Sequence, residues 1–405
     1  MRLRPVLAAT AAAALASIAW AGTVAPAAGA APAAPAVQPA KHVSRVCAQA
    51  APGHAACNAL RVDTVAVAGS VTPNATTPSG IFPADIQSAY KLPGATAGAG
   101  RTVAIVDAFD DPTAAADLNT YRSQFGLPAC TTANGCFRKV NQNGATSPLP
   151  TVDTGWAQEI SLDLDMVSAT CPNCHILLVE ASSASFANLG AAVNQAAALG
   201  ATAISNSYGG ADARDTTNGH FYNHPGIAVT ASSGDGGFGV EYPASSQFVV
   251  AVGGTSLRRA STTARGWTET AWSGAGSGCS RFNTAIPSAS TFNTGCSRRA
   301  VADVSAVADP ATGVAVFDST PAAGASGWLV FGGTSASSPI IASVYGLAGN
   351  AATIDANDFP YQHAASLFDV TTGSNGTCSP TQLCRARAGW DGPTGLGTPN
   401  GTGAF

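Results

Sequence analysis

Short apolar strands alternate with helical segments along most of this chain, and that alternation limits the folds open to it. The runs 103–106 (VAIV) and 176–179 (ILLV) are apolar throughout, as strands buried on both faces are. Residues 185–199 have helical spacing, with Ser185 as N-cap and Gly200 at the end. Three more strand-like runs cover 201–205, 227–231 and 248–252. The pattern predicts an α/β fold in which helices flank a mostly parallel central sheet, with ligand sites at the carboxyl ends of strands.

Charged residues are scarce. Among 405 residues there are 19 Lys+Arg and 23 Asp+Glu, or 10% charged, against roughly a quarter in an average domain. No stretch could neutralise a run of phosphates, which excludes a nucleic-acid binder built on basic patches. The apolar fraction of 46% argues against a disordered chain, and 44 Gly with 25 Pro argue against a coiled coil. A weakly charged globular protein remains, with one large domain or two smaller ones.

The N-terminus has the pattern of a secretory signal peptide. Arg2 and Arg4 precede an uncharged apolar run over 6–21, and small-residue cleavage motifs follow at 19–21 and 28–30. The run is too short and wrongly flanked for a membrane anchor, and a buried N-terminal helix is the less favoured alternative. We therefore expect residues 1–30 to be removed and the product to be secreted, extracellular and free of the membrane.

The next 50 positions, residues 31–80, differ from the rest of the chain in their composition and residue pattern. Residues 23–40 are almost entirely Ala, Pro, Gly, Thr and Val, as flexible leaders are, and only a short apolar run follows at 65–68. Alternating strands and helices begin at Ile81. We expect residues 31–80 to form a short leader and residues 81–405 the main domain.

Ten cysteines fall into five near-neighbour couples. These are Cys47/Cys57, Cys130/Cys136, Cys171/Cys174, Cys279/Cys296 and Cys378/Cys384. An even number in an exported chain predicts disulfides that close short loops. The 171–174 spacing also fits a redox motif or half of a zinc site, but no second such pair or His pair completes a zinc set. Structural disulfides are the favoured interpretation.

The segment 332–339 (GGTSASSP) places a serine where a helix should begin. A glycine turn followed by the helical pattern at 340–347 would put the Ser335 hydroxyl at a helix N-terminus, where backbone N–H groups favour negative charge. That setting suits a nucleophile, although the segment taken alone favours Ser335 as a simple helix cap. The segment is not a Gly-x-Ser-x-Gly elbow, because Ser337 stands where the second glycine should be.

Two acidic residues lie one helical turn apart in the segment 156–169. Ile160, Leu164 and Val167 form a core-facing stripe, and Glu159 and Asp163 share a face at its edge. Two neighbouring carboxylates repel, so one holds its proton more tightly, and such a pair can serve as base and orienter for a nucleophile. A solvated acidic helix face is the ordinary alternative.

A third candidate is Asp235, in the glycine-rich segment 231–237 (ASSGDGG) at the end of a strand-like run. Glycines allow a ligand to approach the backbone closely. A protonated Asp235 could donate a hydrogen bond to a developing oxyanion. An aspartate in an ordinary glycine turn is the alternative.

Together these segments resemble the sedolisin (serine-carboxyl peptidase) family. Its Gly-Thr-Ser-x-Ser-x-Pro, Glu-x-x-x-Asp and Ser-Gly-Asp motifs match 333–339, 159–163 and 233–235 in family order. The resemblance implies a subtilisin-like fold and a Ser-Glu-Asp triad. It makes Ser335 the nucleophile, Glu159 the general base, Asp163 its partner and Asp235 the oxyanion residue. Further stretches that look like family landmarks extend the resemblance over about 81–405; they are 83–93, 242–246 with 251–255, and 304–313.

The same resemblance suggests a substrate strand and a calcium site. Ser207, Tyr208 and Gly209 resemble the strand that binds the substrate backbone, with Tyr where Trp is frequent, so the subsite preferences stay open. One Ca²⁺ is implied, with oxygen ligands suited to that ion; the matching residues are Asp369, Val370, Arg387 (by its carbonyl), Gly389 and Asp391. The leader is much shorter than the family's folded propeptide. Either folding needs no large intramolecular chaperone, or this short propeptide plugs the cleft.

Other hydrolases fit less well. A subtilisin with a Ser-His-Asp triad needs a histidine in a His-Gly-Thr-like context, and none of the six histidines has one. Asp107, after the strand 103–106, resembles the subtilisin aspartate but without that histidine is expected to be structural. Glycosidase carboxylates flank a sugar about 5–9.5 Å apart, unlike adjacent residues on one helix face.

We therefore expect a secreted, acid-active serine-carboxyl endopeptidase that acts as a monomer on protein or peptide substrates. An optimum of about pH 3–5 follows from a carboxylate base that must be ionised and an Asp235 that must stay neutral. The alternative is a catalytically weak or inactive secreted family member that acts as a binding protein. Whether the cut is internal or removes tripeptides is left open.

Overall fold

The computed structural model describes residues 42–63 and 76–405. The expected signal peptide, the Ala/Pro-rich segment 23–40 and the run 65–68 lie outside the described residues. In the part of the chain that is described, no helix is long and apolar enough to cross a bilayer.

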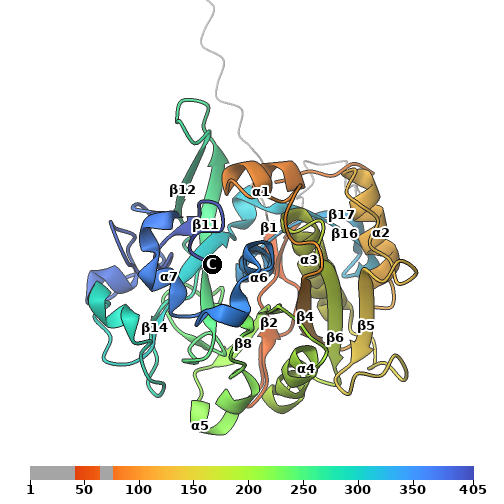
Figure 1. The fold of residues 1–405 in the computed structure, drawn as a ribbon, viewed down its shortest axis with the longest axis horizontal. Helices are drawn as coiled ribbons and strands as arrows, with labels where there is room; N and C mark the ends of the chain where they lie inside the picture. The colour runs from red at the N-terminus through yellow and green to blue at the C-terminus, as the bar shows by residue number, and fades with distance from the viewer. Residues whose placement is uncertain (1–41, 64–75) are drawn as a thin grey trace, which may run out of the picture. The chain divides into compact units, whose positions relative to one another are not determined.

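A large, mostly parallel sheet forms the centre of the fold (Figure 1). Its strand order is β12-β11-β9-β7-β4-β6-β5, and β15 also pairs with β11. Every pairing in it is parallel except that of β11 with β12. In chain order the strands are β4 (Thr102–Ala108), β5 (Phe137–Asn141), β6 (His175–Ala181), β7 (Ala203–Asn206), β9 (Ala228–Ser232), β11 (Val250–Arg259), β12 (Trp267–Ala271) and β15 (Val304–Val307). The predicted α/β class and parallel sheet are confirmed, and β11 runs well beyond the expected 248–252.

Helices cover the sheet and pack against one another (Figure 1). Helix α6 (Thr334–Ala348) lies across β7, β9, β11 and β15, while α4 (Phe186–Ala198) packs on β4 and β6. As predicted, α4 has Ser185 as its N-cap, whose hydroxyl accepts from the Asn188 N–H at 3.2 Å. Helix α3 (Thr154–Thr170) packs against α6, β4 and the shorter α2 (Ala114–Gln124) and α1 (Pro83–Ala89).

Helix α3 is buried on all of its faces, whereas its single apolar stripe predicts only one buried face. All of its residues from Gly155 to Thr170 are buried. The reason is a second, antiparallel sheet of order β1-β3-β17-β16, whose strand β16 covers α3. Its strands are β1 (His42–Arg45), β3 (Leu60–Asp63), β16 (Val314–Ala322) and β17 (Ala325–Gly332). Glu159 and Asp163 therefore lie inside the protein instead of at the edge of an apolar face.

The described part of the expected leader belongs to the same compact unit as the rest of the described chain. Besides β1 and β3 it supplies β2 (Ala56–Cys57), the edge of a small sheet of order β10-β8-β2 with β8 (Tyr208–Ala211) and β10 (Glu241–Tyr242). The remaining short elements are α5 (Asp215–Asn218), β13 (Gly278–Cys279), β14 (Ala300–Val301), α7 (Phe359–Gln362), β18 (Leu367–Phe368) and β19 (Thr398–Pro399).

All five predicted cysteine couples are disulfide-bonded in the structure. Each closes a short loop, with sequence separations from 3 to 17 residues. The bond Cys171–Cys174 directly follows the end of α3, so the Cys-x-x-Cys spacing is used to turn the chain from this helix into β6.

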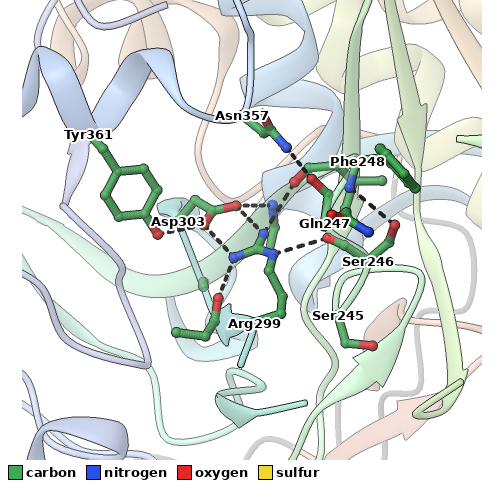
Figure 2. Close-up of polar contacts among 12 residues, drawn as sticks. Ser245, Ser246, Gln247, Phe248, Arg299, Asp303, Asn357 and Tyr361 are labelled. Carbon is green, nitrogen blue, oxygen red and sulfur yellow. Dashed lines mark hydrogen bonds and ion pairs between the residues drawn. The ribbon is translucent and has the colours of Figure 1, made fainter. Parts of the chain in front are cut away.

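The buried ion pair between Arg299 and Asp303 links the segment after β10 to the central sheet (Figure 2). Arg299 and Asp303 are both fully buried, and Arg299 also donates to the backbone oxygens of Ser246 at 3.0 Å and Val249 at 3.2 Å. Asp303 accepts from the Tyr361 hydroxyl at 2.6 Å and from the Ala251 N–H of β11 at 2.7 Å. Because both charged groups are fully buried, removing one of them would leave the charge of the other uncompensated.

Candidate active site

Ser335 is the second residue of α6, directly after a sharp glycine turn. The N-cap Gly333 has a φ of 92°, a left-handed conformation that glycine adopts readily. A Cβ there would lie 2.0 Å from the backbone oxygen of Asn58, so the close approach of these two segments requires glycine. Pro339 lies inside the helix and lacks the N–H that would bond to the Ser335 carbonyl. The Ser335 carbonyl is thus free and accepts from the Ser207 hydroxyl at 3.4 Å. The Ser335 N–H is free because it belongs to the first turn of the helix, and it donates to the Asn58 oxygen at 3.3 Å.

Glu159 and Asp163 lie on α3, which packs directly on α6. Both side chains are fully buried. Ser207, just before β8, links the two helices: its hydroxyl donates to Asp163 Oδ1 at 2.8 Å, and its carbonyl accepts from Ser335 Oγ at 3.1 Å. Within the described chain no residue donates a well-formed hydrogen bond to Glu159, because the Ser335 hydroxyl is directed at Ser207. The structure brings these predicted residues into one buried cluster.

Burial is the main reason that the pKa of Glu159 lies well above its ordinary value. The nearby carboxyls of Asp163 and Asp107 raise it further, and the Ser335 hydroxyl opposes the rise. The pKa of Asp163 is also well above its usual range, through burial and then Asp107, while the hydroxyl of Ser207 lowers it. Acids this close together in a dry site cannot all ionise, so the cluster keeps protons that the same groups would lose in water.

Asp107 is the residue of this cluster whose place the sequence did not indicate. It lies in β4, is fully buried, and neither of its oxygens has a hydrogen-bond partner among the described residues. Burial raises its pKa to about 8. Sequence reasoning set it aside as structural, yet it raises the pKa of both Glu159 and Asp163. The available signal was its position directly after the apolar run 103–106.

Asp235 lies in the loop after β9, next to the start of α6. Its Oδ1 accepts from the Thr334 N–H at 2.7 Å and from the Thr334 hydroxyl at 2.9 Å. Its Oδ2 is buried and has no partner in the described part of the chain. Burial raises its pKa to about 7, and the bonds from Thr334 oppose the rise. In acid, Asp235 therefore presents an unpaired O–H beside the turn that carries Ser335.

The expected substrate strand lies in the middle of the small sheet. Strand β8 pairs with β10 on one side and with β2 on the other. Tyr208 is fully buried, and its hydroxyl donates to Asn206 Oδ1 at 2.7 Å, so its side chain belongs to the core and only its backbone is placed to pair with another strand. The backbone edge that a substrate would use is paired here with residues 56–57 of the chain itself.

Comparison with known proteins agrees with this geometry. Residues 140–363, which include all four predicted catalytic residues, match the subtilase family. The chain belongs to the subtilase family.

Within that family its relatives are sedolisins. The chain is 28% identical over 365 residues to kumamolisin from Bacillus sp. (strain MN-32), a match that covers 80% of this chain and 63% of kumamolisin. A 109-residue stretch is 37% identical to tripeptidyl-peptidase sed1 of Aspergillus fumigatus, covering 25% of this chain and 15% of that protein. The chain thus spans under two thirds of the length of these relatives. The recognition of a sedolisin from its motifs is confirmed.

Solved structures support the fold. Pseudomonas sedolisin, a serine-carboxyl proteinase complexed with two molecules of pseudo-iodotyrostatin, superposes with a TM-score of 0.66 at 25% identity, over 80% of this chain and 96% of that one. Sphericase has a TM-score of 0.51 at 17% identity, over 80% of this chain and 99% of its own, which is a likeness of fold alone. The subtilisin-like architecture predicted from the sequence is confirmed.

The calcium residues expected of a sedolisin lie together near the C-terminus. Asp369 Oδ2 accepts from the Gly389 N–H at 2.9 Å, and Asp391 Oδ2 accepts from the Arg387 N–H at 3.1 Å. Burial, and to a lesser extent Asp369, raise the pKa of Asp391 to about 7. Across the described residues no group of three or more His, Cys, Asp and Glu side chains gathers at one point, so any cation here would depend on backbone oxygens.

Two further residues adjoin this site, and sequence reasoning singled out neither. Asn58 comes from the expected leader, and Glu241 begins β10. The Asn58 side chain donates to Glu241 Oε2 at 3.2 Å and to Ser232 Oγ at 3.0 Å. Burial raises the pKa of Glu241 to about 7, while the bond from Asn58 lowers it. Glu241 could have been noticed, because it is one of only four glutamates and precedes the Tyr-Pro landmark; nothing in the sequence marks Asn58.

Proposed function

We propose that this sedolisin is a secreted serine-carboxyl endopeptidase that hydrolyses proteins or peptides in acid. The observation that supports this most is the cluster that brings Ser335 together with Glu159, Asp163 and Asp235. An N-terminal signal-like sequence and five disulfides support secretion. Peptides bound along β8 would be its substrates.

In this mechanism Ser335 Oγ attacks the peptide carbonyl, and Glu159 takes the hydroxyl proton and later gives it to the leaving amine. Asp163, fixed by the Ser207 hydroxyl at 2.8 Å, orients Glu159. The Ser335 N–H and a protonated Asp235 donate to the oxyanion, because the Asp235 Oδ2 has no competing partner among the residues described. Water then releases the acyl group from Ser335.

The direction of the pH dependence follows from the same groups. Glu159 works as a base only when ionised, whereas Asp235 works as a donor only when neutral. Burial holds the pKa of Glu159 well above its ordinary value in this structure, and admitting water to the site would return that pKa toward the ordinary range of carboxyls. Asp235, with a pKa of about 7, stays neutral in acid. Both requirements are met on the acidic side, at about pH 3–5.

The residues of the predicted calcium site fit the ion. Asp369 and Asp391 bring two carboxylates close enough to interact, and no described residue donates a backbone hydrogen bond to the carbonyls of Val370, Arg387 or Gly389. An all-oxygen set with two negative charges is what Ca²⁺ prefers. The ion would neutralise the two carboxylates and fasten this C-terminal loop; it has no step in the hydrolysis.

The alternative, an inactive member that only binds peptides, is favoured by one observation: residues 56–57 of the chain itself already pair with β8. Incubating the protein with a denatured protein at about pH 4 separates the two. We expect fragments from internal cuts with the wild type and none with Ser335→Ala. An intact substrate that stays bound to both proteins would support the binding role, and release of tripeptides alone would contradict endopeptidase action.

A further inference from the structure

Two hydrogen bonds from Thr334 end on the same oxygen of Asp235. The Thr334 N–H donates to Asp235 Oδ1 at 2.7 Å, and the Thr334 hydroxyl donates to that oxygen at 2.9 Å. A backbone N–H can only donate, so Oδ1 has to act as an acceptor. A neutral carboxyl has one acceptor oxygen of the carbonyl type and one O–H oxygen. The O–H of a neutral Asp235 therefore belongs on Oδ2.

A third hydrogen bond sets the direction of the Thr334 hydroxyl. The Gly234 N–H donates to Thr334 Oγ1 at 3.1 Å. Because that bond uses a lone pair of the oxygen, the single hydroxyl hydrogen is left for Asp235. Gly234 is itself held, since its carbonyl accepts from the Gly276 N–H at 2.8 Å. The Thr334 hydroxyl therefore links the loop that carries Asp235 to the carboxyl of that residue.

The other oxygen of Asp235 has different surroundings. Oδ2 is buried and has no hydrogen-bond partner among the described residues. It lies 2.6 Å from the point where a Gly333 Cβ would be, so it borders the turn that leads into Ser335. An unpaired donor beside the backbone of the nucleophile is what an oxyanion site requires. The two oxygens thus differ in role, and the bonds from Thr334 make the difference.

Three charged side chains act on Asp235 without choosing between its oxygens. Glu241 of β10 raises its pKa, and Arg45 of β1 lowers it. Glu159 on α3 is the third, since Asp235 in turn raises the pKa of Glu159. These charges affect the carboxyl as a whole. Within the described chain, only Thr334 donates hydrogen bonds to the Asp235 side chain.

We propose that Thr334 is a positioning residue of the reaction: by donating twice to Oδ1, it keeps the proton of Asp235 on Oδ2, from which it can be shared with the oxyanion. The inference rests on the proposed peptidase function and assigns a residue that acts through Asp235. Without the Thr334 hydroxyl, Oδ1 keeps one donor and the carboxyl is freer to turn. A turned carboxyl presents a bare acceptor oxygen to the oxyanion, which repels it.

The same hydroxyl affects the ionisation of Asp235. A donor stabilises an ionised carboxyl more than a neutral one, so the bonds from Thr334 oppose the rise in pKa that burial causes. Removing the hydroxyl should raise this pKa further, and Asp235 would stay neutral to higher pH. The variant should therefore be slower and yet keep its remaining activity to higher pH. A merely loosened active site would not produce that combination.

The test is the pH dependence of kcat and KM for the full-length Thr334→Val between about pH 3 and about pH 8. Valine has the shape of threonine without the hydroxyl. We expect kcat to fall about tenfold or more, with little change in KM, since losing an oxyanion donor outright costs about a hundredfold or more. The fall in kcat on the alkaline side should move up by about one pH unit. The fall on the acid side, set by Glu159, should stay in place.

Thr113 offers a matched control at the start of α2. Its N–H and its hydroxyl both donate to Asp111 Oδ1, each at 2.9 Å, so the same pair of donors meets a buried carboxyl there. Thr113→Val should lower stability but leave kcat and its pH dependence unchanged. Thr334→Ser keeps the hydroxyl and should restore both properties. If Thr334→Val does not fold, Thr334→Ala, which also lacks the hydroxyl and is smaller, carries the same expectation.

The outcomes separate this inference from the proposed function. An unchanged kcat in Thr334→Val, or an alkaline fall that stays in place or moves to lower pH, would overturn the role of Thr334 while the wild type still cuts the peptide through Ser335. Equal changes in Thr113→Val would show a general loss of stability and would also overturn it. A wild type without any Ser335-dependent hydrolysis would instead contradict the proposed function.

Discussion

Asp318 offers a sharp test of how the stability of this protein depends on pH. It lies in β16, is fully buried, and only its Oδ1 has a hydrogen-bond partner in the described chain, the Thr320 N–H at 2.9 Å. Burial, and then the carboxyls of Asp111 and Asp117, raise its pKa from 3.8 to about 7. The folded protein therefore keeps a proton on Asp318 at pH values where the unfolded chain has lost it.

That difference fixes the sign of the effect. Below about pH 4 both states bind the proton, and the full stability is present. As the pH rises toward 7, folding must retain the proton or bury a charge, so the free energy of unfolding falls. At about 1.4 kcal/mol per pH unit, Asp318 alone removes about 3 kcal/mol between about pH 4 and pH 7. Asp318→Asn keeps the acceptor for Thr320 and removes the titration.

The assay is urea unfolding of Asp318→Asn, measured in a Ser335→Ala background to prevent self-digestion. We expect the variant to match its parent within about 1 kcal/mol at about pH 4 and to exceed it by about 3 kcal/mol at about pH 7. The comparison at acid pH is the internal control, since both side chains are neutral there. Parallel stability curves for the two proteins would refute the reasoning.

Three further predictions concern the ion pair, the base and the metal. Arg299→Met should destabilise the protein by about 3–5 kcal/mol in urea unfolding, because it leaves Asp303 buried and unpaired; a loss below about 1 kcal/mol would contradict this. Glu159→Gln should lower kcat by about a hundredfold or more, whereas Asp165→Asn, an equally buried acid on α3 that bonds to the Phe317 N–H at 2.9 Å, should retain most activity; equal losses would show a general effect of burial. Removing calcium with a chelator should lower Tm, and Asp391→Asn should abolish that shift; an unchanged Tm in the wild type would remove the proposed site.

Much of the fold could be predicted because local pattern decides it. The apolar runs at 103–106 and 176–179 are strands of the central sheet, each with a neighbour on both sides, and the helix over 185–199 begins and ends close to its signals. Three catalytic motifs in family order located residues on α3, α6 and the loop after β9. Each motif is a short continuous stretch of sequence, so its residues could be recognised without knowing which distant segments they contact.

The burial of α3 could not be predicted from its own residues. The cover is β16, some 150 positions later, and a stripe of Ile160, Leu164 and Val167 gives no hint that the opposite face is also enclosed. The same holds for Asp107, whose effect on the acid cluster depends on where β4 ends relative to α3. These elements are far apart in the sequence, and it is the chain topology that brings them together.

The position of the leader, residues 31–80, was the part of the structure that the sequence predicted least. Its composition suggested a flexible segment, and one expectation was that it plugs the cleft, but no local signal gave its register. In the structure the register is set by the Cys47–Cys57 disulfide and by pairing with β8 and β17. It takes those long-range constraints to bring Asn58, among many small polar residues, to Ser335.

The central claim is that a serine and carboxyl groups, without histidine, hydrolyse peptides in acid. It is tested most directly by kcat/KM as a function of pH for the wild type beside Ser335→Ala, on one fluorogenic peptide. We expect a bell-shaped profile with its maximum at about pH 3–5, limited in stronger acid by protonation of Glu159 and at higher pH by ionisation of Asp235, and no measurable rate for the variant. A maximum above neutrality, or full activity in Ser335→Ala, would contradict it.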